Sequence, residues 1–240
     1  MIRKLLLGLC IVICLCGALP AMSQDGGVRV KCDRYTINVP SSNARCFRTD
    51  GNIPVSETAS PEEIEAAQVA NTAIAFIDYE KVTSWISPQV VFYSVDDLAK
   101  TSFDLLDIAT EMSDMMNNIN AEYATVQDVY QNVPFLPYQS RQRTVNALPE
   151  KIDFTGGSGI RTIAVFGESI ESTSSSANLY YSFQGVSSDG NLYISAVFPI
   201  RSSILNGQAA AGVSWDAETV NSFVPSIEEL DFYVKSLVIE

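Results

Sequence analysis

Alternating apolar and polar residues mark strands along much of this chain. Residues 28–32 and 35–39 alternate with a period of two, which is the spacing of a strand with one buried face. The segments 72–79 and 89–93 are rich in β-branched and aromatic residues, so they are also expected to be strands. Four more strands are predicted at residues 144–154, 161–167, 180–185 and 192–199.

Turn signals separate the later strands. The run 155–159 is rich in glycine and predicts a turn, in which Gly157 and Gly159 would take positive φ angles. The segment 188–191 contains an Asp-Gly pair and predicts a hairpin turn. Residues 203–215 are mostly small and predict a loop.

Capping residues and helical spacing predict three helices. Ser60, followed by proline and two glutamates, is expected to begin a short first helix. From Asp96 the apolar period becomes helical and predicts one long central helix. Ser226 and Glu229 form the pattern of a capping box, which predicts a C-terminal helix. The apolar side of that last helix consists of Leu230, Tyr233, Val234 and Leu237.

The order of these elements predicts an α+β fold. An antiparallel β-sheet meander carries one long central helix and a C-terminal helix packed on it. The helix-strand tail after the meander is also similar to the Mog1/PsbP-like sandwich, an analogy that concerns the fold alone. No internal repeat or linker divides the chain, so residues 24–240 are expected to form a single domain.

The central helix carries two stripes of opposite character. The apolar stripe contains Leu105, Ile108, Ala109, Met112, Met115, Met116 and Ile119. Such a stripe is typical of a core-facing side, and a methionine-rich binding groove is the alternative. The acidic stripe contains Asp104, Asp107, Glu111 and Asp114. It is typical of a solvated face, because carboxylates along a helix do not converge on one calcium ion.

The first 23 residues have the organisation of a signal peptide. Arg3 and Lys4 precede an apolar run from Leu5 to Ala18, and Ala21-Met22-Ser23 offers a cleavage site. The run is shorter than the ~20 residues that a membrane-spanning helix needs. We therefore expect export, cleavage before Gln24, and an extracellular or cell-surface location.

The five cysteines fall into two groups with different predicted roles. Three lie inside the leader, and each follows leucine or isoleucine. Because lipoprotein processing requires a small residue before the cysteine, lipidation is the less favoured interpretation. Cys32 and Cys46 are the cysteines of the mature chain. In an oxidising compartment such a pair predicts a disulfide, and two buried thiols are the alternative.

Composition narrows the chemistry that the chain can perform. After residue 23 there are 28 carboxylates and 13 cations, which gives a net charge of −15. Such a charge disfavours nucleic acid as a partner and tolerates a basic protein. Histidine is absent, which excludes Ser-His-Asp and Cys-His catalysis and histidine-containing zinc sites. The glycine-rich nucleotide-binding motifs are also absent, so we expect no nucleotide, cofactor or metal.

Six short segments in the second half of the chain form a recognisable set. They are 134–137 (PFLP), 153–154 (DF), 157–161 (GSGIR), 181–185 (YSFQG), 189–190 (DG) and 198–199 (FP). In order and spacing they resemble an uncharacterised family of secreted bacterial proteins over about 65 residues. A Ser/Thr tract at 167–177 departs from that family's pattern. Because the family has no assigned activity, the resemblance implies export and fold and does not imply a reaction.

Some residues of these segments are candidates for ligand binding. Arg161 is expected to pair with Asp153 across a hairpin, and holding an anionic ligand is its alternative role. Tyr180, Tyr181 and Gln184 are candidates to line a carbohydrate or peptide groove, although strand residues of this kind also serve as core.

Two functional classes fit this sequence. The favoured one is a secreted, non-catalytic module that binds a carbohydrate, a peptide or a basic protein at the cell surface. The alternative is a glycosidase-like hydrolase, which needs only two carboxylates about 5–10 Å apart. Glu168, Glu171 and Asp189 are the first candidates for that pair.

Overall fold

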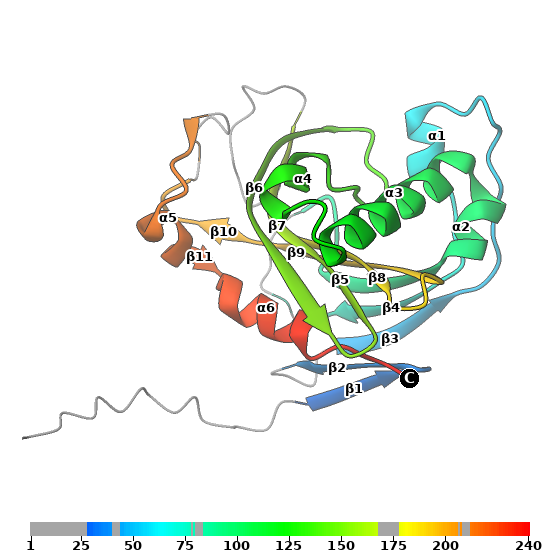
Figure 1. Ribbon diagram of the computed structural model, residues 1–240, viewed down its shortest axis with the longest axis horizontal. Helices are drawn as coiled ribbons and strands as arrows, with labels where there is room; N and C mark the ends of the chain where they lie inside the picture. The colour runs from blue at the N-terminus through cyan, green and yellow to red at the C-terminus, as the bar shows by residue number, and fades with distance from the viewer. Residues whose placement is uncertain are drawn as a thin grey trace, which may run out of the picture.

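A computed structural model describes residues 28–39, 44–77, 79, 84–167, 178–205, 207 and 212–240 (Figure 1). The proposed signal peptide lies outside these residues. The largest element is a seven-stranded sheet with strand order β3-β4-β5-β9-β8-β7-β6, in which neighbouring strands are antiparallel. The fold is therefore α+β with an antiparallel meander, as the sequence predicts.

The large sheet consists of two meanders joined side by side. The first contains β3 (Ala44–Thr49), β4 (Asn71–Phe76) and β5 (Gln89–Ser94). The second contains β6 (Gln142–Phe154), β7 (Gly157–Gly167), β8 (Leu179–Ser187) and β9 (Leu192–Pro199). Pairing of β5 with β9 joins them, so β3 and β6 are the two edge strands.

A second, smaller sheet packs near the first meander. It has the order β1-β2-β12, from β1 (Val28–Cys32), β2 (Tyr35–Val39) and β12 (Val238–Ile239). The hairpin turn between β1 and β2 is formed by Asp33 and Arg34, and Asp33 has a positive φ of 57°, which aspartate tolerates better than most residues.

Helices cover the large sheet on both faces (Figure 1). One face carries α1 (Pro61–Glu65), α2 (Val95–Thr101), α3 (Phe103–Asn120), α4 (Val126–Val129) and the 3-10 turn η1 (Tyr130–Asn132). The other carries α6 (Ile227–Lys235) and the small sheet. Strand β9 shows this division, because Tyr193 packs in the cluster below α3 while Ile194 and Phe198 pack in the cluster below α6.

The predicted caps and stripes are present. Ser60 forms a complete capping box with Glu63. Ser226 accepts a hydrogen bond from the Glu229 backbone, but only this half of the predicted capping box is formed, because the Glu229 carboxylate accepts a hydrogen bond from the Tyr233 hydroxyl instead. In α3 the apolar stripe is buried or half-buried, so its methionines belong to the core, while the acidic stripe is exposed.

The prediction of one long central helix is wrong in one respect. The helix is divided at Ser102, whose backbone is extended with φ −160° and ψ 147°. The Ser102 hydroxyl accepts a hydrogen bond from the Asp104 backbone and so caps α3. Serine competes for backbone hydrogen bonds in this way, which favours a helix start over a helix interior.

Several short elements follow the meander. Strands β10 (Arg201–Ser202) and β11 (Phe223–Val224) form a two-residue ladder, and α5 (Ala217–Asn221) lies between them in the chain. The sequence pattern did not predict β10 or β11, because two residues are too few to show a period.

Candidate functional site

Gln184 has a structural role inside the protein. Its side chain accepts hydrogen bonds from the Leu136 backbone (3.1 Å) and the Tyr193 hydroxyl (2.7 Å). Its amide group donates to the Leu136 carbonyl (3.3 Å), to the Ser182 hydroxyl (3.0 Å) and to the Ser195 hydroxyl (3.2 Å). The side chain is fully buried. Gln184 therefore ties the 134–137 segment to the sheet.

The motif glycines allow close packing and not a turn. Gly157 and Gly159 lie inside β7, and the positive φ of that hairpin belongs to Gly156, at 98°. A Cβ atom on Gly159 would lie 2.3 Å from the Gln184 carbonyl oxygen and 2.5 Å from the Gly185 Cα. The prediction that Gly157 and Gly159 take positive φ is therefore wrong. Glycine is required at these two positions because neighbouring atoms leave no room for a Cβ.

Arg161 pairs with different carboxylates from the one expected. Its guanidinium contacts Glu150 on β6 and lies 3.3 Å from Asp231 on α6. The expected partner Asp153 instead binds Lys151 at 2.7 Å. Arg161 is opposite Glu150 in the strand register, whereas Asp153 is opposite Ser158. The register and the packing of α6 thus decide the pairing.

The two tyrosine candidates are also buried. Tyr181 donates a hydrogen bond of 2.8 Å to Asp231 and is fully buried beneath α6. Tyr180 is buried on the opposite face, where its hydroxyl accepts hydrogen bonds from the Ser84 hydroxyl (2.9 Å) and the Trp85 backbone (3.2 Å). The structure brings Arg161 and Tyr181 together around Asp231, but it separates both from Tyr180 and Gln184. None of the four presents an open binding surface.

Asp231 is a desolvated carboxylate within this buried group. Burial raises its pKa, and the Arg161 guanidinium and the Tyr181 hydroxyl oppose that effect. Burial also raises the pKa of Tyr181 well above its usual value. Arg161 contacts both Asp231 and Glu150, so this acid pair is already bound to a cation and holds α6 against the sheet.

The acids proposed for hydrolysis do not form a described pair. Glu168 and Glu171 lie outside the described residues. Asp189 is exposed in the β8–β9 turn, where hydrogen bonds from Ser187 and Asn191 lower its pKa.

A polar cleft lies between the β1–β2 hairpin and the edge of the large sheet. Its volume is about 290 Å³, near the lower end of the range typical of small-molecule sites. Four segments contribute: the β1–β2 turn, the end of β3, the start of β4, and β5 with the start of α2. The lining residues are Asp33, Arg34, Tyr35, Arg48, Thr49, Asp50, Ala70, Asn71, Thr72, Phe92, Ser94 and Asp97.

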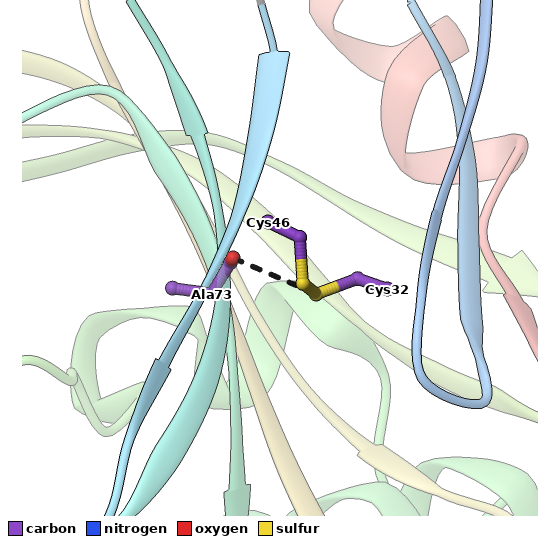
Figure 2. The surroundings of a disulfide bond; sticks show 3 residues. All are labelled: Cys32, Cys46 and Ala73. Carbon is purple, nitrogen blue, oxygen red and sulfur yellow. Dashed lines mark hydrogen bonds between the residues drawn. A yellow bond between two sulfur atoms is a disulfide. The ribbon is translucent and has the colours of Figure 1, made fainter.

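A disulfide joins the two sheets beside this cleft. Cys32 at the end of β1 is bonded to Cys46 on β3, as the sequence predicts, and their Cα atoms are 5.4 Å apart (Figure 2). The sulfur of Cys32 lies 3.8 Å from the Ala73 carbonyl oxygen on β4, a packing contact because a disulfide sulfur carries no hydrogen. Asp33 directly follows one half-cystine and Arg48 lies two residues after the other. The disulfide therefore sets how the hairpin faces the edge strand.

Aromatic rings form the floor of the cleft. Tyr35 on β2 stacks on Phe92 of β5 with ring centroids 3.9 Å apart and parallel planes. Arg34 lies over the Tyr35 ring at 5.5 Å, within the range of a cation–π contact, and its Nε lies 3.4 Å from the Tyr35 hydroxyl oxygen. Both rings are buried, so this floor is firmly held.

Hydrogen-bond donors and acceptors surround this floor. The Tyr35 hydrogen bond and the nearby carboxylates of Asp189 and Asp33 raise the pKa of Arg34. Burial alone would raise the pKa of Asp97, but hydrogen bonds from Lys100 and Asn52 outweigh burial and lower it. Asp97 is therefore held as an ionised acceptor, which suits binding better than proton donation.

The cleft had no signature in the sequence. Its residues come from four segments spread between positions 33 and 97, and each segment looks like an ordinary strand end or turn.

Among the residues that the structure describes, no group of three or more Asp, Glu, Cys or His side chains is placed to hold a metal ion. Within the same residues, every helix is too short or too polar to cross a membrane.

Comparison with known proteins gives no family assignment. No family model, no curated protein and no solved structure matches this chain. The similarity to secreted bacterial proteins and the analogy to the Mog1/PsbP-like sandwich therefore stay predictions.

Proposed function

We propose that this protein is an exported, non-catalytic binding module that holds a neutral, hydroxylated ligand in the polar cleft. A single sugar unit at the end of a glycan has this chemistry. The observation that carries the proposal is the arrangement of Arg34, Asp97 and Asn71 around the Tyr35–Phe92 floor.

The mixture of charges supports a neutral ligand over an ion. Arg34 and Arg48 face Asp33, Asp50 and Asp97 in one cleft, so a strongly anionic or cationic ligand would meet like charges. Sugar hydroxyls donate and accept hydrogen bonds, and they can therefore use carboxylate, guanidinium and amide groups together.

Two features support a role outside the cytoplasm. The proposed signal peptide and the disulfide are both consistent with an oxidising compartment. Amino-terminal sequencing of protein recovered from outside the cell should give Gln24 as the first residue. Recovery with Met1 intact from the cytosol would contradict this part of the proposal.

Glycan and peptide arrays probed with the mature protein test the binding role. We expect retention on a subset of neutral glycans. Arg34→Ala should weaken that binding at least about tenfold, the effect of losing one charge-assisted hydrogen bond. Arg29→Ala is the matched control, because Arg29 is an exposed cation of the same hairpin that does not line the cleft.

The outcomes separate the functional classes. Silent glycan arrays would contradict the carbohydrate proposal, and retention only on peptides would move the ligand to that class. Release of new reducing ends from a retained glycan would instead support the carboxylate-dependent hydrolase.

A further inference from the structure

Charge is distributed unevenly over this acidic protein. Residues 28–48 contain five cations and one carboxylate, whereas residues 103–132 contain six carboxylates and no cation. The first segment forms β1, β2 and β3, and the second forms α3, α4 and η1. The molecule therefore has a basic region and an acidic region built from different elements.

The acidic region contains a wide groove. It has a volume of about 630 Å³ and lies between α3 and the α4–η1 segment. Met115 and Val129 supply apolar surface, while Glu111 and Asp114 supply carboxylates. We call this the acidic groove; its remaining lining residues are Asn118, Gln131, Asn132 and Arg143.

Arg143 is the one cation among these lining residues, and backbone oxygens already hold it. Its guanidinium donates to the Val133 carbonyl (2.6 Å) and the Gln131 carbonyl (3.3 Å). Arg143 therefore donates its hydrogen bonds within the protein, and Glu111 and Asp114 remain available to a partner. Both carboxylates are exposed.

The basic region presents a matching projection. On β3, Arg45 and Phe47 point to the same face because strand side chains alternate. The Phe47 side chain is 50% exposed, and Arg45 makes no ion pair with any residue that the structure describes. We call this pair the basic edge, an aromatic ring next to an unpaired guanidinium.

The basic edge and the acidic groove lie at opposite sides of the molecule. Strand β3 is one edge of the seven-stranded sheet, and Arg143 of the groove is on β6, the other edge. Six strand spacings separate the two edges, a distance of roughly 29 Å. One copy cannot bring its own edge into its own groove.

We propose that copies of this chain assemble head to tail, with the basic edge of one copy docked in the acidic groove of the next. Phe47 packs against Met115 and Val129, and Arg45 pairs with Glu111 or Asp114. Such a contact is heterologous, so it leaves one edge and one groove open at the ends of each assembly and permits continued growth.

Edge-to-edge pairing of two β3 strands is a less favourable way to associate. In an antiparallel pair centred between Cys46 and Phe47, Arg45 of each copy would lie opposite Arg48 of the other. Like charges directly opposite each other destabilise a strand pair, and charged residues protect sheet edges against this pairing.

Analytical ultracentrifugation of the mature protein over a range of concentrations tests the proposal. We expect the mass-average molecular weight to rise with concentration at about 50 mM salt and to fall towards the monomer at about 500 mM salt, because added ions screen the charge contacts. Wild-type protein that stays monomeric at low salt would overturn the proposal, and an acidic surface for some other basic partner would take its place.

Two blocked variants give the sharper test. Arg45→Ser with Phe47→Ser disables the basic edge without giving it a charge that a lysine-bearing groove would attract, and Glu111→Lys with Asp114→Lys disables the acidic groove. Each variant alone should associate at least about tenfold more weakly than wild type. Mixed together, they should form a one-to-one dimer and nothing larger, because one intact edge meets one intact groove.

Controls separate assembly from folding and from net charge. Glu57→Lys with Glu218→Lys changes the charge as much as the groove variant does, at exposed sites outside both surfaces, and should associate like wild type. Unchanged circular dichroism shows that each variant folds. A mixture that forms no dimer, or a blocked variant that still grows into long assemblies, would refute head-to-tail docking.

Discussion

Gly159 on β7 faces Gly185 on β8, and the two backbones pack closely because neither residue has a side chain. Replacing Gly159 by alanine should therefore force the strands apart. We expect Gly159→Ala to lower the free energy of unfolding by about 3 kcal/mol, the upper part of the range for overpacked sites. Chemical denaturation monitored by fluorescence would measure the loss.

Gly212→Ala is the matched control for this prediction. Nothing lies within 4 Å of a Cβ built at Gly212, and its φ is not positive. Its stability should stay within about 0.5 kcal/mol of wild type. Equal losses in both variants would show that close strand packing does not explain Gly159.

Asp231 should make a pH-dependent contribution to the free energy of unfolding, with the sign opposite to that of a carboxylate whose pKa is lowered by folding. Because burial raises its pKa, the folded state binds a proton more tightly than the unfolded state does. Between the ordinary carboxyl pKa of about 3.9 and the raised value, rising pH therefore lowers the stability that Asp231 contributes. The difference in unfolding free energy between wild type and Asp231→Asn should grow in favour of wild type as the pH falls through this window.

Comparison of paired denaturation curves from pH 7 downward would check this. Glu228→Gln, an exposed carboxylate on the same helix, should show no such trend. A difference between wild type and Asp231→Asn that shrinks on acidification would mean that the Arg161 ion pair dominates and that the pKa of Asp231 is not raised.

At the scale of elements, the segment 134–137 depends on one side chain of β8. Gln184→Leu would leave the buried backbone amide of Leu136 without its partner and would also remove the acceptor of the Tyr193 hydroxyl. We expect a loss of about 3 kcal/mol, the cost of unpaired buried polar groups. Hydrogen exchange should also speed up at the Leu136 amide.

The exposed Gln127 on α4 offers a matched control. Gln127→Leu should change the unfolding free energy by no more than about 0.5 kcal/mol. If Gln184→Leu were as stable as its control, the loop would be held by packing of Phe135 and Leu136 alone.

Elements with a local signal could be predicted from the sequence, and those that depend on distant pairing could not. The Ser60 and Ser226 caps and the Asp189-Gly190 turn are encoded by neighbours within four residues. Strand β12 has only two residues and exists because Val238 pairs with Thr36, about 200 positions earlier. No period in the sequence reports such a contact.

The same distinction applies to the candidate site. The sequence suggested ligand-binding residues at positions 161, 180, 181 and 184, because their side chains can form hydrogen bonds or stack. In the structure these side chains are buried and hold the fold together. Arg161 contacts Asp231, which lies 70 positions later in the chain, because α6 packs across β6 and β8. The polar cleft could not be predicted because it exists only after the small sheet has docked against β3.

At the scale of the whole molecule, the Cys32–Cys46 disulfide connects the small sheet to the large one. It closes a loop with a sequence separation of 14 residues, for which the chain-entropy model gives about 3 kcal/mol of stabilisation. We expect a Cys32→Ser, Cys46→Ser double variant to unfold at a lower denaturant concentration, with an unfolding free energy about 3 kcal/mol below that of wild type.

The double variant should nevertheless fold, because β2 still pairs with β12 and buries Ile37 and Val39 in the main core. Its hairpin would be held to β3 by packing alone, so amide exchange should increase in β1 and β3 more than in β8. Reductant should lower the stability of wild type to that of the variant and leave the variant unchanged. Wild type that is equally stable with and without reductant would mean that noncovalent contacts already fix the two sheets together. The cleft would then owe its shape to the Tyr35–Phe92 stack and not to the disulfide.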